Sequence, residues 1–413
     1  MTETEDTAHL IPKDGEKKES PRKENKAEEA PAAPLEGQLK TLIVLMIAIC
    51  ISQFTYMNVV ALLPDYIKAH YPNFSSIAVG ILLAIYPLGF FFMAIVAGAY
   101  QGRIGRKNMV LYSVIGLTIG DLLFAFAAFI DNDIGFYAVS AIGRLIQGSS
   151  DALVNVVAFA IVAIEYPEKA ELYCGWISVA LGMGNCLGPF IGSFVQNFAH
   201  YQGTMFFFAG VVFVFGLPLA CCLPSRLNNV TQQEEDTEEQ EEVPFSKFLT
   251  SGKAFIVTLT LVNSFMCFIF FEPTMAPALT SPPHNLSQTE AGNIFTLLAF
   301  TFAAAAPLIG WLSEVISPYH IYGASLFFLS LSDFLVGPSE IFPNDAFLII
   351  IGVGLIGIFV SGTFVPSIPM LISAVHDEMN SEKEKAGKPK AEEPSTEASD
   401  KSAAVAMMCY SFG

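Results

Sequence analysis

Long apolar runs decide what this chain can fold into. Stretches of roughly 20 apolar residues follow one another along most of the sequence, and each is long enough to cross a bilayer as a helix. With 53% hydrophobic and 15% charged residues, the composition excludes a soluble domain. We therefore predict an all-α, polytopic membrane protein. The predicted spans are Thr41–Pro64, Ile77–Tyr100, Met109–Ile130, Phe136–Ile164, Tyr173–Phe194, Met205–Leu223, Phe255–Leu279, Ile294–Ile316, Ile321–Val336 and Ala346–Ala374.

An eleventh apolar run begins at Ala403 and stops at Gly413. It is too short to cross a hydrocarbon core of about 30 Å. The sequence therefore predicts that the chain ends inside its eleventh helix, with the last helices truncated.

Basic residues predict the orientation. If the N-terminus is cytosolic, the predicted inner segments hold nearly all the lysine and arginine outside the spans, and the outer loops hold only Lys68, as the positive-inside rule requires. The formal charge of −18 comes from acids in the N-terminal tail, in Glu234–Glu242 and in Asp377–Asp400. These three segments are predicted to be disordered.

Two sets of spans divide the chain. We predict a disordered cytosolic tail over 1–40, a six-helix bundle over 41–224, a charged cytosolic linker over 225–253, and an incomplete C-terminal bundle over 254–413. Parallel repeats of this kind place a substrate cavity between the halves near the bilayer midplane. Transport would then proceed by rocking one half against the other.

The fifth span is rich in glycine and contains a proline. Small residues allow close helix approach, and the proline removes one helical hydrogen bond and bends the span. Two interpretations stay open: a static helix contact, or a moving part of a transporter. The residues are Gly175, Gly182, Gly184, Gly188, Pro189 and Gly192.

Three segments resemble signatures of the major facilitator superfamily. Gly98 to Lys107 resembles its loop motif, Arg144 to Gly148 its fourth-helix arginine motif, and Gly175 to Gly192 its antiporter motif. The resemblance implies two six-helix halves, and it implies conformational roles for a set of residues in these motifs and in a second loop copy. Those residues are Gly98, Arg103, Gly105, Arg106, Gly184, Gly188, Pro189, Gly192 and Glu314.

Two further segments narrow the resemblance. Phe271 to Thr274 and Val365 to Pro369 resemble the vesicular amine transporter family, nearest its polyamine-type branch. The chain departs from the family pattern at Gly102, where the loop motif usually has an acid. It departs again at Asn58, where monoamine transporters have a membrane aspartate, and this argues against a monoamine substrate.

Ionisable residues inside the predicted spans are the candidates for chemistry, because each is costly in a bilayer unless it faces a partner or a wet cavity. Four acids stand against one base, which favours organic cations and exchangeable protons. We predict substrate binding by Glu272, Asp151, Asn58 and Asn155, with Glu272 holding the cation beside helix-opening prolines. We predict proton coupling by Asp121, Arg144, Asp151 and Asp333.

Other roles for these residues stay open. Arg144 and Asp151 are seven residues apart, so they share a helix face and would either pair or face one cavity. Asp121 would alternatively hydrogen-bond a neighbouring helix, Arg144 would alternatively brace helix ends, and Asp333 would alternatively reach only the outer interface.

The sequence favours a secondary transporter that works by alternating access, in proton-coupled antiport of organic cations such as polyamines. Alternatives are a drug or metabolite antiporter of another substrate class, and a non-transporting receptor or scaffold. No cofactor, metal or enzymatic activity is expected, because no nucleophile with a base, no clustered metal ligands and no phosphate loop are present. Asp6 to Ile11 fits an acidic dileucine pattern, which predicts sorting adaptors as partners and an endosomal, lysosomal or vesicular membrane, with the plasma membrane as the alternative.

Overall fold

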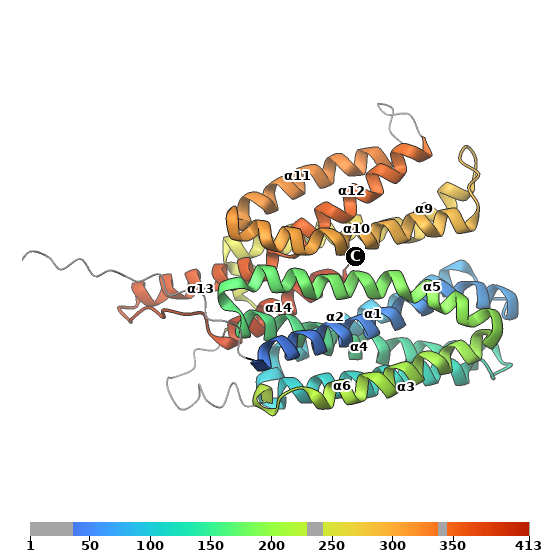
Figure 1. The fold of residues 1–413 in the computed structure, drawn as a ribbon, viewed down its shortest axis with the longest axis horizontal. Coiled ribbons are helices and arrows are strands. Elements are labelled where there is room, and N and C mark those ends of the chain that lie inside the picture. The colour runs from blue at the N-terminus through green and yellow to red at the C-terminus, as the bar shows by residue number, and fades with distance from the viewer. Residues whose placement is uncertain (1–35, 229–242, 338–344, 413) are drawn as a thin grey trace, which may run out of the picture. The chain divides into compact units, whose positions relative to one another are not determined.

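The computed structural model describes residues 36–228, 243–337 and 345–412. Within these ranges, the side chains at positions 36, 271–274, 276, 277, 288 and 289 lie outside the description. Regular structure in the described ranges is helical, as predicted. Figure 1 shows the helices coloured along the chain.

The first set of helices is α1 Glu36–His70, α2 Ser76–Ile104, α3 Arg106–Ala127, α4 Asp133–Glu165, α5 Ala170–Val211, the π-helical segment η2 Val212–Gly216, and α6 Leu217–Cys222. The second set is α8 Lys247–Thr250, α9 Gly252–Thr280, α10 Gln288–Val315, α11 Pro318–Val336, α12 Ala346–Phe364, α13 Ser367–Lys385 and α14 Thr396–Ser411.

Nine segments of the described residues are long and apolar enough to cross a membrane. The stretch Pro167–Cys222 covers the predicted fifth span and nearly all of the predicted sixth. The two are separated inside α5 at His200, where the backbone leaves helical geometry with φ 56°. The predicted tenth span consists of two helices, since α12 ends at Phe364 and α13 begins at Ser367. The helix α14 begins at Thr396, seven residues before the predicted apolar run.

The prediction of disorder over Asp377–Asp400 is wrong for most of that segment. Helix α13 continues to Lys385, and α14 starts at Thr396 with its first turn capped by the Ser395 hydroxyl. Acids in the segment find basic partners, since Asp377 pairs with Lys253 at 2.9 Å and Glu382 pairs with Lys247. Such pairing offsets the charge repulsion on which the disorder prediction rested.

The helices pack in two groups that meet along two seams. In the first group α1 packs on α5, and α4 lies between α2 and α3. In the second group α12 lies between α10 and α11. The groups meet where α5 packs on α10 and where α14 packs on α2 (Figure 1).

The glycines of α5 serve two different neighbours. A Cβ at Gly184 or Gly188 would lie 2.6 or 2.5 Å from a backbone carbonyl oxygen of α1, and one at Gly192 would lie 2.0 Å from Asn58 Oδ1. On another side, a Cβ at Gly175 would lie 2.6 Å from the Ala306 carbonyl oxygen of α10. The contact with α1 lies within the first set, and the contact with α10 joins the two sets.

Replacing Gly148 with alanine is expected to destabilise the first set. A Cβ there would lie 2.0 Å from the Tyr86 carbonyl oxygen, so α2 and α4 would have to separate. Overpacking of this kind costs roughly 1–3 kcal/mol, and we expect the thermal unfolding midpoint of the purified protein to fall by several degrees. The control is Gly210→Ala, where nothing lies within 4 Å. An equal midpoint for the two variants would contradict this packing.

Candidate functional site

A cavity of about 700 Å³ lies between the two sets of helices. We call the end of the bundle that carries Arg103, Arg106 and Lys107 the basic end, which the positive-inside rule predicts to be cytosolic. The cavity lies toward the opposite end, where Asp65 in its wall is exposed. The wall is mostly apolar, with a few polar groups: Tyr56 and Asp65 from α1, Arg144 from α4, Asn185 from α5 and Thr296 from α10.

Arg144 supplies the positive charge in the cavity wall. Its guanidinium lies over the rings of Tyr56 and Tyr86, with 5.6 and 5.2 Å between its Cζ and the ring centroids. Its Nη1 donates to Gln147 Oε1 at 3.4 Å, while Nε and Nη2 are buried without a hydrogen-bond partner among the described residues. Stacking on aromatic faces stabilises the cation, and the remaining N–H groups can take up a ligand or water.

Asp121 is joined to Arg144 through one amide. Gln147 Nε2 donates to Asp121 Oδ1, and the same side chain accepts from Arg144 on its oxygen. Asp121 Oδ2 is buried without a partner in the described part of the chain. The structure thus gives Asp121 the inter-helix hydrogen bond expected from its alternative role, and it also links this acid to the cavity.

Asp151 is enclosed by donors. It accepts hydrogen bonds from Ser52 and Tyr86, from Gln53 at 3.0 Å and from Asn155 at 2.8 Å. These groups come from α1, α2 and α4, and Asp151 has no exposed surface. Because all four partners donate, the arrangement fits an ionised carboxylate, whose lone pairs accept about four bonds.

A second amide connects Asp151 to the other set of helices. Gln53 donates to Asp151 through Nε2 and accepts from the Tyr410 hydroxyl on Oε1 at 3.3 Å. Tyr410 belongs to α14, which packs on α2 at one of the two seams. The Gln53 side chain therefore connects Asp151 to the contact between the two sets of helices.

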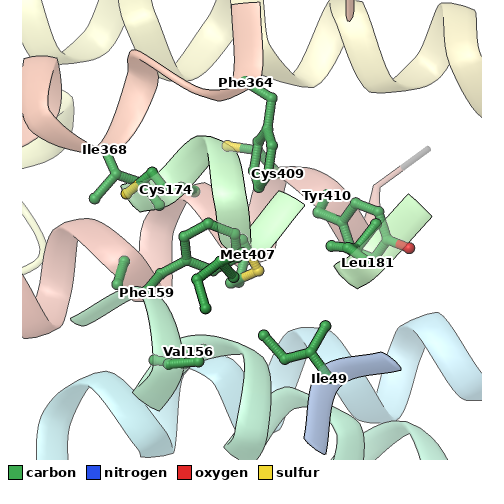
Figure 2. Close-up of a cluster of buried hydrophobic side chains, with 14 of the residues drawn as sticks. Ile49, Val156, Phe159, Cys174, Leu181, Phe364, Ile368, Met407, Cys409 and Tyr410 are labelled. Carbon is green, nitrogen blue, oxygen red and sulfur yellow. The ribbon is translucent and has the colours of Figure 1, made fainter. Parts of the chain in front are cut away.

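Buried aromatic and aliphatic side chains separate the cavity from the basic end. Figure 2 shows residues of this cluster from both sets of helices. Phe159 of α4 meets Phe364 of α12 with ring centroids 5.3 Å apart, and Phe90 of α2 meets Tyr410 of α14 at 5.8 Å. Contacts between the sets thus close the route to this end.

An ion pair closes the basic end itself. Arg106 Nη2 donates to both carboxylate oxygens of Asp400 at 2.7 and 2.8 Å, and the two side chains are 2% and 6% exposed. The chain turns into position at Gly105, whose φ of +93° is strained for other residues. Gly98 lets α14 approach, since a Cβ there would lie 2.4 Å from that of Ala404. The structure is therefore closed at the basic end.

Several predicted site residues lie elsewhere. Asn58 and Asn155 are buried outside the cavity wall, Asn58 against Met205 and Asn155 against Asp151. Asp333 of α11 lies within hydrogen-bond reach of Cys267 of α9, outside that wall. The Glu272 side chain lies outside the described residues, so its predicted role stays a prediction.

Arg144 and Asp151 neither pair nor share the cavity: no ion pair between them occurs in the described residues, and only Arg144 reaches the wall. Of the motif residues, Pro189 lines the cavity, Arg103 lies over the Tyr100 ring, and Glu314 is exposed on α10.

Sequence reasoning missed three residues that build the site: Gln53, Tyr410 and Asp400. Polar residues inside an apolar span were a usable signal for Gln53, as they were for Asn58. Nothing in the spacing of Asp400 marks it as the partner of Arg106, since 294 residues separate them.

Comparisons with known proteins agree with this architecture. The family model described as Major Facilitator Superfamily matches residues 45–281. The rat MFS-type transporter SLC18B1 is 25% identical over 244 residues, covering 58% of this chain and 50% of that protein. A probable vesicular acetylcholine transporter-A of Danio rerio is 25% identical over 275 residues, covering 61% and 50%. The chain thus spans about half the length of these relatives.

The solved structure of the human organic anion transporter MFSD10 superposes with a TM-score of 0.64 at 16% identity, covering 92% of each chain. This likeness concerns the fold. It matches the predicted fold class, and the SLC18B1 and acetylcholine transporter similarities match the resemblance to vesicular amine transporters. With the family model covering more than half of its length, this multi-pass membrane chain belongs to the Major Facilitator Superfamily.

Proposed function

We propose that the protein is a secondary transporter that exchanges protons for organic cations such as polyamines by alternating access. The observation that carries this proposal is the Asp151 site. Asp151 is a buried acid that accepts from neutral donors and has no basic partner among the described residues. The Gln53 amide connects it to Tyr410 on α14 of the other set.

Protonation of Asp151 would change the hydrogen bonds of this site. A protonated carboxyl donates one bond itself and cannot keep accepting from all four present donors. At least one of the bonds from Ser52, Gln53, Tyr86 and Asn155 would break or, at the Ser52 or Tyr86 hydroxyl, reverse its direction. Loss of the Gln53 bond would free the Gln53–Tyr410 contact between the sets. A proton taken up from the open side would thus loosen the closed side.

The cavity offers two features suited to a cation. Asp65 places a carboxyl in the wall near the open end, and Tyr56 exposes a ring face there. The sequence adds Glu272 in α9, whose side chain lies outside the described residues. Among relatives, SLC18B1 and a vesicular acetylcholine transporter share this chain's family, and the second is named for an organic cation.

Arg144 supports a second candidate, in which the substrate is an organic anion. Its guanidinium lies in the cavity wall with Nε and Nη2 unpaired in the described region. The solved structure with a similar fold is an organic anion transporter. A drug or metabolite antiporter of this kind would use Arg144 to bind substrate and not to position Asp121. The scaffold alternative has no such observation in its favour.

Uptake by proteoliposomes holding the complete protein distinguishes these candidates. With an acidic interior, one pH unit supplies about 1.4 kcal/mol per proton, so a one-for-one exchanger accumulates spermidine up to about tenfold. We expect spermidine to accumulate and a labelled organic anion to remain at the level of empty vesicles. Accumulation of the anion alone, abolished by Arg144→Gln, would establish the second candidate. Movement of neither would overturn both.

We propose a vesicular or endosomal location, reached through adaptors that read Asp6 to Ile11. That segment lies outside the described residues, and the pattern in the sequence supports the proposal. Changing Leu10 and Ile11 to alanine is expected to move the tagged protein from internal membranes to the cell surface. Unchanged vesicular staining by light microscopy would contradict it.

A further inference from the structure

Two adjacent cysteines end helix α6 at the basic end of the bundle. Cys221 and Cys222 are exposed and have free thiols. The Cys221 carbonyl oxygen accepts from Lys107 Nζ at 2.9 Å, and Arg226 pairs with Glu165 at 2.9 Å just beyond the helix. Charged groups at this level mark the boundary between membrane and water on the cytosolic side. Both thiols are therefore within reach of cytosolic reactants.

A groove of about 600 Å³ leads away from Cys222 along the outside of the first set. Its walls come from α1, α5, η2 and α6. Between Val211 and Cys222 it follows the chain for roughly 16 Å at 1.5 Å per helical residue. The lining residues are Ile47, Cys50, Ile51, Phe54, Leu187, Ile191, Val211, Val214, Phe215, Pro218, Leu219 and Cys222.

The π-helical segment η2 forms part of the groove wall through Val214 and Phe215. The side chains of Val214 and Phe215 are 60% and 59% exposed, so they border the groove without filling it. Every lining side chain except the two cysteine thiols is hydrocarbon, and such a surface fits an acyl chain.

We propose that Cys222 is S-acylated and that the acyl chain lies in this groove. The thiol is part of the groove wall at its cytosolic end, so a chain attached there can enter it directly. Cys221 is also exposed but does not line the groove, which selects Cys222 of the pair. Juxtamembrane cysteines of this kind are typical sites of reversible palmitoylation.

The chemistry is acyl transfer from a long-chain acyl-CoA thioester. The Cys222 thiolate attacks the thioester carbonyl, a new carbon–sulfur bond forms, and the bond to coenzyme A breaks. Coenzyme A leaves as a thiol that carries the proton lost by Cys222, so no oxidant or reductant is required. The bound chain would fill the space beside the α1–α5 seam and stabilise the first set. This inference is independent of the transported substrate.

Metabolic labelling tests the site. Cells with palmitoyltransferases express the complete protein in the presence of an alkyne analogue of palmitate, and hydroxylamine is used to cleave thioesters. We expect hydroxylamine-sensitive label on the wild type, retained in Cys221→Ser and lost in Cys222→Ser. Label that is absent from the wild type, or that follows Cys221, would overturn the proposal.

A second measurement tests the groove. Acylation is expected to raise the thermal unfolding midpoint of the wild type above that of Cys222→Ser, and Ile51→Trp, which fills the groove, should remove that difference while the label remains. Native mass spectrometry of Cys222→Ser detects the competing occupant, a phospholipid. A phospholipid retained there, or a difference in midpoint that persists in Ile51→Trp, would show that the acyl chain does not occupy the groove.

Discussion

Replacing Asp151 with asparagine is expected to abolish transport driven by a pH gradient while leaving substrate exchange without a gradient. An asparagine has about the same shape, but it carries no exchangeable proton and cannot accept all four present hydrogen bonds. Accumulation should fall from up to about tenfold per pH unit to the level reached without a gradient. Uptake of labelled spermidine into proteoliposomes, with and without an imposed gradient, measures both activities.

Ser52→Ala is the matched control. It removes one donor to Asp151 but keeps the carboxyl group, so gradient-driven uptake should persist. The asparagine variant must also reach the membrane and unfold at a temperature close to that of the wild type. If the variant keeps gradient-driven accumulation, Asp151 is not the proton site. If both activities disappear from a well-folded variant, its role lies in substrate binding.

Replacing Asp400 with asparagine is expected to open the basic end. The Arg106 guanidinium would then be buried without a charged partner in the closed state, and breaking a buried pair in this way costs about 3–5 kcal/mol. Since each 1.4 kcal/mol is a factor of ten, the equilibrium should move by roughly 100-fold or more toward the open state. Uptake should fall as the protein stays open at one side.

A cysteine at Ala404 reports this opening, because Ala404 is fully buried where α14 meets Gly98. With Cys221 and Cys222 changed to serine, a membrane-impermeant thiol reagent applied from the basic side should modify Ala404→Cys much faster in the Asp400→Asn background. Exchanging the pair, with Arg106→Asp and Asp400→Arg together, should restore slow modification. Equal rates in all three backgrounds would show that the ion pair does not hold this end closed.

The sequence predicts the helical class and most spans, because apolar length and the distribution of basic residues are properties of the chain alone. It also places Arg144, Gln147 and Asp151 on α4. It does not predict which neighbours meet that helix. Three of the four donors to Asp151 come from α1 and α2, far away in the chain, and three-dimensional packing brings them to α4.

The surroundings of Asp151 and Asp400 differ from the sequence expectation for a common physical reason. Asp151 was predicted to contact substrate because burial of an acid suggests a wet cavity, yet donors from two neighbouring helices satisfy it away from the cavity wall. Asp400 was placed in a disordered acidic loop, yet a distant arginine and an N-capping serine order the start of α14. In both cases partners from distant parts of the chain offset the free-energy cost of burying or ordering an acid. Local sequence patterns indicate that cost but not the partners.

The release of protons during substrate entry tests the proposed mechanism most directly. Proteoliposomes with the complete protein carry a pH-sensitive dye inside, and spermidine is added outside. We expect the interior to become more alkaline as the cation enters, with no such change in the Asp151→Asn variant. Entry of spermidine without proton movement, or equal alkalinisation in the variant, would contradict exchange through Asp151.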